Sequence, residues 1–310
     1  MSSVSDNSAN GSAPMKTTRP FVWSVRREIW EHRAVWIAPS AAAGLVLFGF
    51  LLRILKLPAL LEKANQLPPM ERAAAIAAPF AISAVSIMIT GVVVSFFFCL
   101  SALNNERRDR SILFWKSLPV SDATAVLAKA FVPFVVVPLI VLGAVIATQL
   151  TMVLIAAVVL STTGNTASVI WSGWPLAHLE LTILYALATG VLWYAPIYGW
   201  LLMVSSWARR VAFLWAVLPW LGLFILEKIA FGTDYVGSFI DYRINGAIQD
   251  GFSFAGHGHH VNIKTMPVID PLTVITPEHF FLSPGLWLGL VATAAFIAAA
   301  VWFRRMRDPG

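Results

Sequence analysis

Two histidine-containing groups are the candidates for metal or acid–base chemistry. His257, His259 and His260 lie within four positions of one another, and imidazole nitrogens bind zinc, copper or nickel. No fourth ligand or supporting second shell can be named for them, so a polar loop tip is favoured over a metal site. His178 and Glu180 are two positions apart, which directs them to different helix faces. The sequence therefore predicts no catalytic residue and no metal ion.

A third group combines basic and aromatic residues in the segment 104–122. Its charged start is followed by Phe114 and Trp115, and arginines beside aromatic rings are typical of a protein-docking surface. A short helix is expected over 108–118, ended by Pro119. Ser121 or Asp122 can then cap the next helix. The residues alone leave open a second interpretation, an interfacial helix anchored by its tryptophan.

The elements that position these groups must lie in a membrane. Hydrophobic residues make up 58% of the 310 positions and charged residues only 12%, and the mean hydropathy is +0.75. Soluble domains carry about 25% charged residues, so a soluble enzyme, a disordered chain and a disulfide scaffold are all excluded. The net charge of +6 fits basic residues on the cytoplasmic side of a membrane protein better than nucleic-acid binding.

The predicted fold is an all-α polytopic membrane protein with six transmembrane helices. About 20 apolar residues are needed to cross a bilayer, and six stretches meet or approach this length, at about 35–55, 80–103, 126–160, 181–204, 211–230 and 284–303. The third is too long for one perpendicular crossing, so we expect it to begin in the cytoplasm with Lys129 and to bend at Pro133 or Pro138. Most Lys and Arg residues then lie on the side of both termini, which is therefore cytoplasmic.

The remaining segments complete the expected organisation. Residues 1–20 are predicted to be a disordered cytoplasmic tail, 35–303 the transmembrane domain, and 304–310 a second cytoplasmic tail. An amphipathic elbow helix over 21–34 is expected to lie in the membrane interface, with a simple extension of the first span as the alternative. Its interface residues are Phe21, Trp23, Arg26, Arg27 and Trp30. The external connection 231–283 is long enough to carry structure of its own.

The segment after the second predicted span contains Glu106-Arg107-Arg108-x-Arg110-Ser111-Ile112-Leu113, then Ser117-Leu118-Pro119-Val120-Ser121, and Lys129 downstream. This pattern resembles permease subunits of type-2 ABC exporters. That family carries E-R-x-x-G-T-like and L-P-V/L-S-like stretches there, although Arg110–Ser111 replaces the commoner Gly-Thr. The stretch from Arg27 to Arg33 is similar to the family's elbow helix, and six spans with both termini inside also agree with it.

The resemblance implies a coupling helix that inserts into a separate ATPase subunit. Its contact residues would be Glu106, Arg107, Arg108, Arg110, Ser111, Phe114, Trp115, Leu118, Pro119 and Ser121, with Arg209 and Arg210 as a smaller second cytoplasmic contact. Because no G-x-x-x-x-G-K-[ST] loop is present, ATP and Mg would be bound by two copies of the partner ATPase, and this chain would not be catalytic alone.

The expected function is therefore that of an exporter permease in the bacterial inner membrane. It would pair with a second permease copy or a paralogue and move an amphipathic or lipid-like cargo by alternating access, without nucleic acid as a partner. Part of the external connection would be re-entrant. The alternative is a non-transporting anchor or regulator of a cytoplasmic ATPase or signalling partner.

Overall fold

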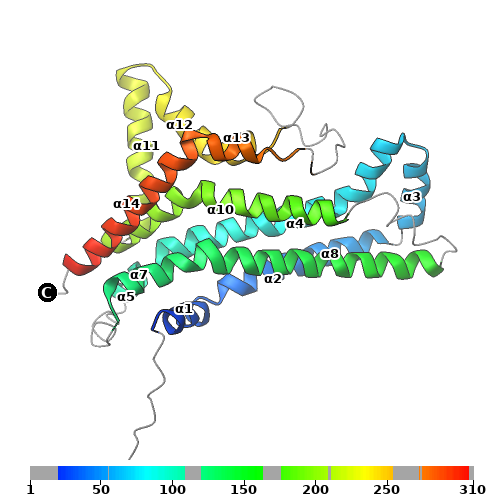
Figure 1. The fold of residues 1–310 in the computed structure, drawn as a ribbon, viewed down its shortest axis with the longest axis horizontal. Helices are drawn as coiled ribbons and strands as arrows, with labels where there is room; N and C mark the ends of the chain where they lie inside the picture. The colour runs from blue at the N-terminus through cyan, green and yellow to red at the C-terminus, as the bar shows by residue number, and fades with distance from the viewer. Residues whose placement is uncertain are drawn as a thin grey trace, which may run out of the picture.

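A computed structural model describes residues 20–54, 56–108, 120–162, 176–208, 211–253, 272 and 274–306. Within these ranges the regular elements are all helices, and the only β-type pairing is an isolated bridge between Phe252 and Ile275. In chain order the elements are α1 (Pro20–Glu31), α2 (Ala34–Ile54), α3 (Leu57–Asn65), α4 (Pro69–Ser101), α5 (Asn104–Arg108), α7 (Asp122–Phe131), a π-helical turn (Val132–Val136), α8 (Val137–Thr162), α10 (Leu176–Trp207), α11 (Ala212–Ala230), α12 (Tyr235–Gly251), α13 (Pro277–Leu282) and α14 (Pro284–Met306). Helices α2, α4, α8 and α10 run side by side along the molecule, as Figure 1 shows.

Six of the described helical segments are long and apolar enough to cross a membrane, which confirms the predicted number of spans. They are Ala34–Ile54, Ala75–Glu106, Asp122–Ser161, His178–Trp207, Ala212–Ala230 and Pro284–Met306. The shortest has 19 residues, which gives a helix about 28 Å long, close to the thickness of a bilayer's hydrocarbon core. Length and composition thus place the chain among multi-pass membrane proteins.

The interior of the bundle is formed mainly by α2, α4, α8 and α10, and α14 packs along α10. Ile87, Val141 and Leu202 are almost completely buried in this core, as is the single cysteine, Cys99. Many large apolar side chains on the outer faces remain exposed instead. In a membrane these outer faces would contact lipid, which is why the helices are apolar on all sides.

The third span is interrupted at the first of its two prolines. α7 ends at Phe131, and the backbone then forms a π-helical turn around Pro133 before α8 begins. Proline lacks the N–H of a normal helical hydrogen bond, and here the backbone accommodates it with a single π turn, the form in which π-helix is usually found within α-helices. Pro138 lies in the first turn of α8, where a missing N–H is tolerated. At the start of α7, Ser121 is the N-cap, and its Oγ accepts a hydrogen bond from Thr124 N at 3.1 Å.

The chain between the fifth and sixth candidate spans contains helices of its own, as its length predicted. α12 follows α11 and contacts α10, α11 and α13, and it lies beside the start of α14 (Figure 1). Trp193 of α10 is fully buried in this region, and its Nε1 donates a hydrogen bond to Arg243 O of α12 at 3.0 Å. The Arg243 guanidinium also lies 4.9 Å from the centre of the tryptophan ring system and donates to Gly285 O at the start of α14. These contacts attach α12 to two of the long helices.

Candidate functional site: a buried ionic cluster

Charged side chains meet inside the protein where α1, α5, α7 and α14 converge, at the end of the bundle that carries α1. Glu28, Glu106, Lys129 and Arg304 are each no more than 6% exposed. Charged side chains are almost never buried to this extent unless they are paired. We call the six charged residues at this point the buried ionic cluster: Arg27, Glu28, Glu106, Asp122, Lys129 and Arg304.

Glu106, in the short helix α5, is the centre of the cluster. Its Oε1 lies 2.6 Å from Arg27 Nη2 of α1 and 3.1 Å from Lys129 Nζ of α7. Its Oε2 accepts a hydrogen bond from Arg304 Nη1 of α14 at 2.7 Å. One carboxylate therefore bonds three helices that are far apart in the sequence.

The other two acidic residues complete the pairing. Glu28 Oε1 accepts from Lys129 Nζ at 2.7 Å and from Arg27 Nη2 at 2.9 Å. Asp122 Oδ1, in the first turn of α7, accepts from Arg304 Nε at 3.0 Å. As a result, each of the three cations contacts two of the three carboxylates.

The cluster contains three positive and three negative groups, so its formal charge is zero. Removing charges from water is costly, and a buried pair is stable only when its geometry is good and its remaining bonding capacity is used. Removal of one partner is strongly destabilising for the same reason. The arrangement therefore fixes the relative positions of four helices, and any relative movement of these helices must rearrange the bonds.

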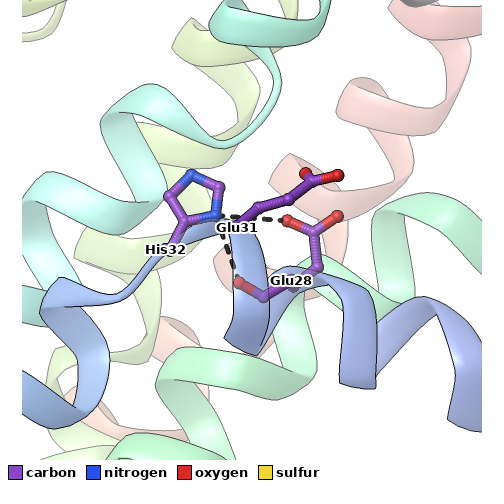
Figure 2. Close-up of side chains that lie close together, drawn as sticks. All are labelled: Glu28, Glu31 and His32. Carbon is purple, nitrogen blue, oxygen red and sulfur yellow. Dashed lines mark hydrogen bonds and ion pairs between the residues drawn. The ribbon is translucent and has the colours of Figure 1, made fainter.

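Glu28, Glu31 and His32 form a group whose ligand atoms lie within 4.8 Å of one another (Figure 2). His32 Nδ1 is 3.3 Å from the Glu28 backbone oxygen and 3.7 Å from Glu28 Oε2. Glu31 Oε1 is 3.1 Å from Arg27 Nε. Because Lys129 and Arg27 already supply positive charge to the two carboxylates, this group is the edge of the buried ionic cluster at Glu28, and we assign no metal to it.

The predicted ATPase-contact residues fall into three sets: some lie at described helices, one is buried in the chain, and the others lie outside the described residues. Arg107 and Arg108 lie in α5, and Ser121 caps α7. Glu106, which was expected to face a partner, instead has both carboxylate oxygens in ion pairs inside the chain. The remaining predicted contacts lie outside the described residues, as do the second cytoplasmic contact and the histidine group: Arg110, Ser111, Phe114, Trp115, Leu118, Pro119, Arg209, Arg210, His257, His259 and His260.

The start of α5 is also attached to the end of α10. Ser205 Oγ accepts hydrogen bonds from the backbone N–H groups of Leu103 and Asn104, both at 3.0 Å. The Asn104 side chain donates to Ala208 O at 3.1 Å. The segments 104–122 and 209–210, for which partner contacts were predicted, are therefore close to each other at Asn104 and at Ala208, the residue that precedes the second segment.

Helix α1 packs against α7 through one face and exposes the other. Val25 and Glu28 are buried, and Phe21 makes an edge-to-face contact with Phe131 at 5.4 Å between ring centroids. Trp23 and Trp30 are more than 60% exposed. Of the predicted interface residues, only Arg27 points into the cluster, where it contacts Glu106.

Sequence reasoning did not identify Glu28, Asp122 and Arg304 as partners of Glu106 and Lys129. One indication was available, because Lys129 stands among apolar residues near the start of the third predicted span. An ionisable residue in such a position needs a partner. The identity of that partner depends on which helices pack together, and the sequence pattern does not contain this information.

Comparison with known protein families, curated proteins and solved structures finds no match to this chain. The class of protein consequently follows from the structure and composition alone. Six apolar helices of spanning length define a multi-pass membrane protein.

Arg304 and Arg305 provide an internal test of the cluster. We expect Arg304→Met to lower the free energy of unfolding by about 2–3 kcal/mol, because it leaves charged acceptors on Glu106 and Asp122 without one donor. Arg305 is exposed, so Arg305→Met should change stability by less than about 0.5 kcal/mol. Thermal unfolding in one detergent measures both variants, and equal effects would contradict a structural role for the cluster.

Proposed function

We propose that this chain is the transmembrane permease subunit of a type-2 ABC exporter. It moves an amphipathic or lipid-like cargo across the bacterial inner membrane by alternating access, driven by a separate ATPase subunit. The resemblance of the segment around Glu106 to the coupling region of that family, together with the six candidate spans, supports this proposal.

The observation that carries the proposal is the position of Glu106 in the buried ionic cluster. Glu106 lies at the start of the proposed coupling segment and is bonded to α1, α7 and α14. A permease must transmit movement of its coupling helix to its spans, and charged hydrogen bonds in a buried site provide a stiff connection. We accordingly assign Glu106 to transmission inside this chain, and the residues that follow it to contact with the ATPase.

Closure of the paired ATPases on ATP would displace the coupling helix. The displacement would act on the third and sixth spans through Lys129 and Arg304, and on the elbow helix through Arg27. Packed helix bundles respond by switching between discrete arrangements, and a nucleotide that binds one arrangement better shifts the population toward it. The spans would thereby alternate between inward- and outward-facing packings.

The other parts of the chain have corresponding roles in this proposal. α1 is the interfacial elbow helix, and the end of the bundle that carries it faces the cytoplasm together with both termini. α12 and α13 form a cap over the external side, where the resemblance implies a partly re-entrant connection. Two ATPase copies, with their ATP and Mg, and a second permease copy or paralogue complete the transporter.

The proposal predicts that the coupling segment is required for assembly with an ATPase. We expect an ATPase subunit to co-purify stoichiometrically with the wild-type chain from native membranes in mild detergent. The double change Arg110→Glu and Trp115→Ala should abolish this, because it reverses a charge and removes the largest apolar side chain of the segment. Mass spectrometry and an ATPase assay of the purified material measure the outcome.

A matched control makes the same chemical changes elsewhere at this end of the bundle. Arg305 and Trp302 are both exposed on the last turns of α14, so Arg305→Glu with Trp302→Ala should retain the ATPase. Absence of any ATPase with the intact wild-type chain would overturn the proposal. An ATPase that binds normally but shows no cargo-stimulated activity in proteoliposomes would favour the anchor or regulator instead.

A further inference from the structure

The exposed face of α1 carries basic and aromatic side chains that the packing of the bundle leaves uncovered. Trp23 and Trp30 are 62% and 64% exposed, and Arg26 and Arg33 are exposed between and beside them. The spacings of three and four residues bring Trp23, Arg26 and Trp30 to one side of the helix, and Arg33 follows in the turn after α1 ends at Glu31. The opposite side is the one that packs against α7 and supplies Glu28 to the buried ionic cluster.

Arg26 is held between the two tryptophans. The guanidinium carbon lies 5.5 Å from the ring centroid of Trp23 and 4.5 Å from that of Trp30. Its interactions with described residues are these two ring contacts, and none of them is with a carboxylate. Stacking restrains a guanidinium plane and leaves its N–H edges free to donate two parallel hydrogen bonds. Such an edge matches the oxygen atoms of a phosphate.

The acidic residues of α1 are kept away from this face. Glu28 is buried and bonded to Lys129, while Glu31 is held by Arg27 at 3.1 Å. The acidic residues of α1 therefore do not neutralise Arg26 or Arg33. The resulting surface is positive and aromatic, and it lies next to α2, whose outer side chains Trp36, Ile37 and Leu45 are exposed and apolar.

We infer that the Trp23–Arg26–Trp30 face of α1 binds the phosphate of an anionic phospholipid. Tryptophan rings favour the headgroup region of a bilayer, and the phosphate would accept hydrogen bonds from the Arg26 guanidinium. Arg33 adds a second positive charge for a headgroup that carries net negative charge. The acyl chains of the same lipid would lie along the apolar side of α2.

The bound lipid would also be close to the buried ionic cluster. Arg26 precedes Arg27 and Glu28, which are bonded to Glu106 and Lys129. A lipid that holds α1 in the membrane surface therefore holds one side of the cluster in place. The inference requires that the chain lies in a membrane, but it does not depend on the identity of the ATPase or the cargo.

The test compares anionic and zwitterionic lipids on the whole protein. The chain is reconstituted in nanodiscs of phosphatidylcholine with a minor fraction of phosphatidylglycerol, released into mild detergent, and its retained lipids are counted by native mass spectrometry. We expect enrichment of phosphatidylglycerol on the wild type. Arg26→Gln should reduce this enrichment about fivefold, the factor that corresponds to one basic residue at an anionic membrane surface.

Two further variants define the site. Arg26→Lys keeps the charge but loses the planar fork, so it should retain only part of the enrichment. Arg53→Gln makes the same change as Arg26→Gln at an exposed arginine near the other end of α2, and it should behave like the wild type. All three arginine variants should elute as intact protein in size-exclusion chromatography, because both positions are exposed.

Three results would overturn the inference. Equal retention of the two lipids by the wild type would show that the face does not select anionic headgroups. An equal loss in Arg53→Gln would show that any exposed arginine near a span end gives the enrichment. Unchanged lipid retention in Arg26→Gln, with loss of a second protein chain from the purified complex, would assign the face to a protein partner.

Discussion

Glu106→Ala is expected to lower the free energy of unfolding by about 3–5 kcal/mol, the range for a buried charge that loses its partner. Within the cluster the change leaves Arg27, Lys129 and Arg304 with two carboxylates, Glu28 and Asp122, and the exposed Glu31 beside Arg27. For a protein of this size the loss corresponds to a decrease of roughly 10 °C in the unfolding midpoint. Thermal unfolding of the purified chain in detergent measures it.

A control and a double variant distinguish the cluster from a general effect of removing an acidic residue. Glu71 is exposed in the first turn of α4, so Glu71→Ala should change stability by less than about 0.5 kcal/mol. Adding Lys129→Met to Glu106→Ala leaves two positive and two negative groups in the cluster, and this restored charge balance should recover part of the loss. Strictly additive effects of the two changes would contradict direct coupling between the two side chains.

The six spans could be predicted because a bilayer imposes its dimensions on the chain. A helix that crosses it needs about 20 apolar residues, and this requirement is local, so it is visible in the sequence. The interruption of the third span was predictable for the same reason, since the missing N–H of Pro133 affects only its own turn. The sequence did not decide between Pro133 and Pro138. That choice depends on which proline lies in the first turn of the helix after the break, where a missing N–H is tolerated.

The buried ionic cluster could not be predicted, because its pairs depend on how the helices pack. Lys129 and Glu28 are 101 positions apart, and Arg304 and Glu106 are 198 positions apart. Each residue taken alone is consistent with a charge near the end of a span, where Lys and Arg usually reach water. The structure instead buries these side chains against one another. The motif around Glu106 therefore predicted a contact with a partner for a glutamate that the structure buries inside the chain.

The inward position of Glu106 changes how the proposed coupling segment would work. An outward glutamate would be one more contact with a partner, and its loss would weaken binding. An inward glutamate connects the segment to three helices, so its loss would separate partner binding from movement of the spans. Under the proposed function, Glu106→Gln, which keeps the shape of the side chain, should therefore retain the ATPase but lose cargo-stimulated hydrolysis.

The attachment of α12 depends on an equally specific contact that composition does not reveal. Trp193 is completely buried, and a Cβ placed on Gly246 of α12 would overlap its ring. The ring is held by its hydrogen bond to Arg243 O and by an edge contact with Tyr242 at 5.2 Å. Burial and, after it, hydrogen bonding to Asp250 raise the pKa of Tyr242, so the Tyr242 side chain that touches Trp193 is a neutral phenol.

Trp193→Ala is expected to lower the free energy of unfolding by about 3–5 kcal/mol, because it leaves a cavity between α10 and α12. Loss of the ring should also release α12, so limited proteolysis after Tyr235 should become faster. Trp36 is exposed on the outer side of α2, and Trp36→Ala in the same detergent should have a much smaller effect. Similar losses for the two tryptophans would contradict a specific role for the α10–α12 contact.

Gly246→Ala then tests whether the Trp193 ring prevents a larger residue at position 246. Alanine is the better helix former by about 1 kcal/mol, yet in the wild-type background we expect a loss of about 1–3 kcal/mol, because the methyl group overlaps Trp193. In the Trp193→Ala background the overlap is gone, and the same change should become neutral or stabilising. Gly222 of α11 has open space at its Cβ position, so Gly222→Ala should be tolerated in both backgrounds. If Gly246→Ala has the same cost with and without the ring, the contact between Gly246 and Trp193 does not hold α12 in place.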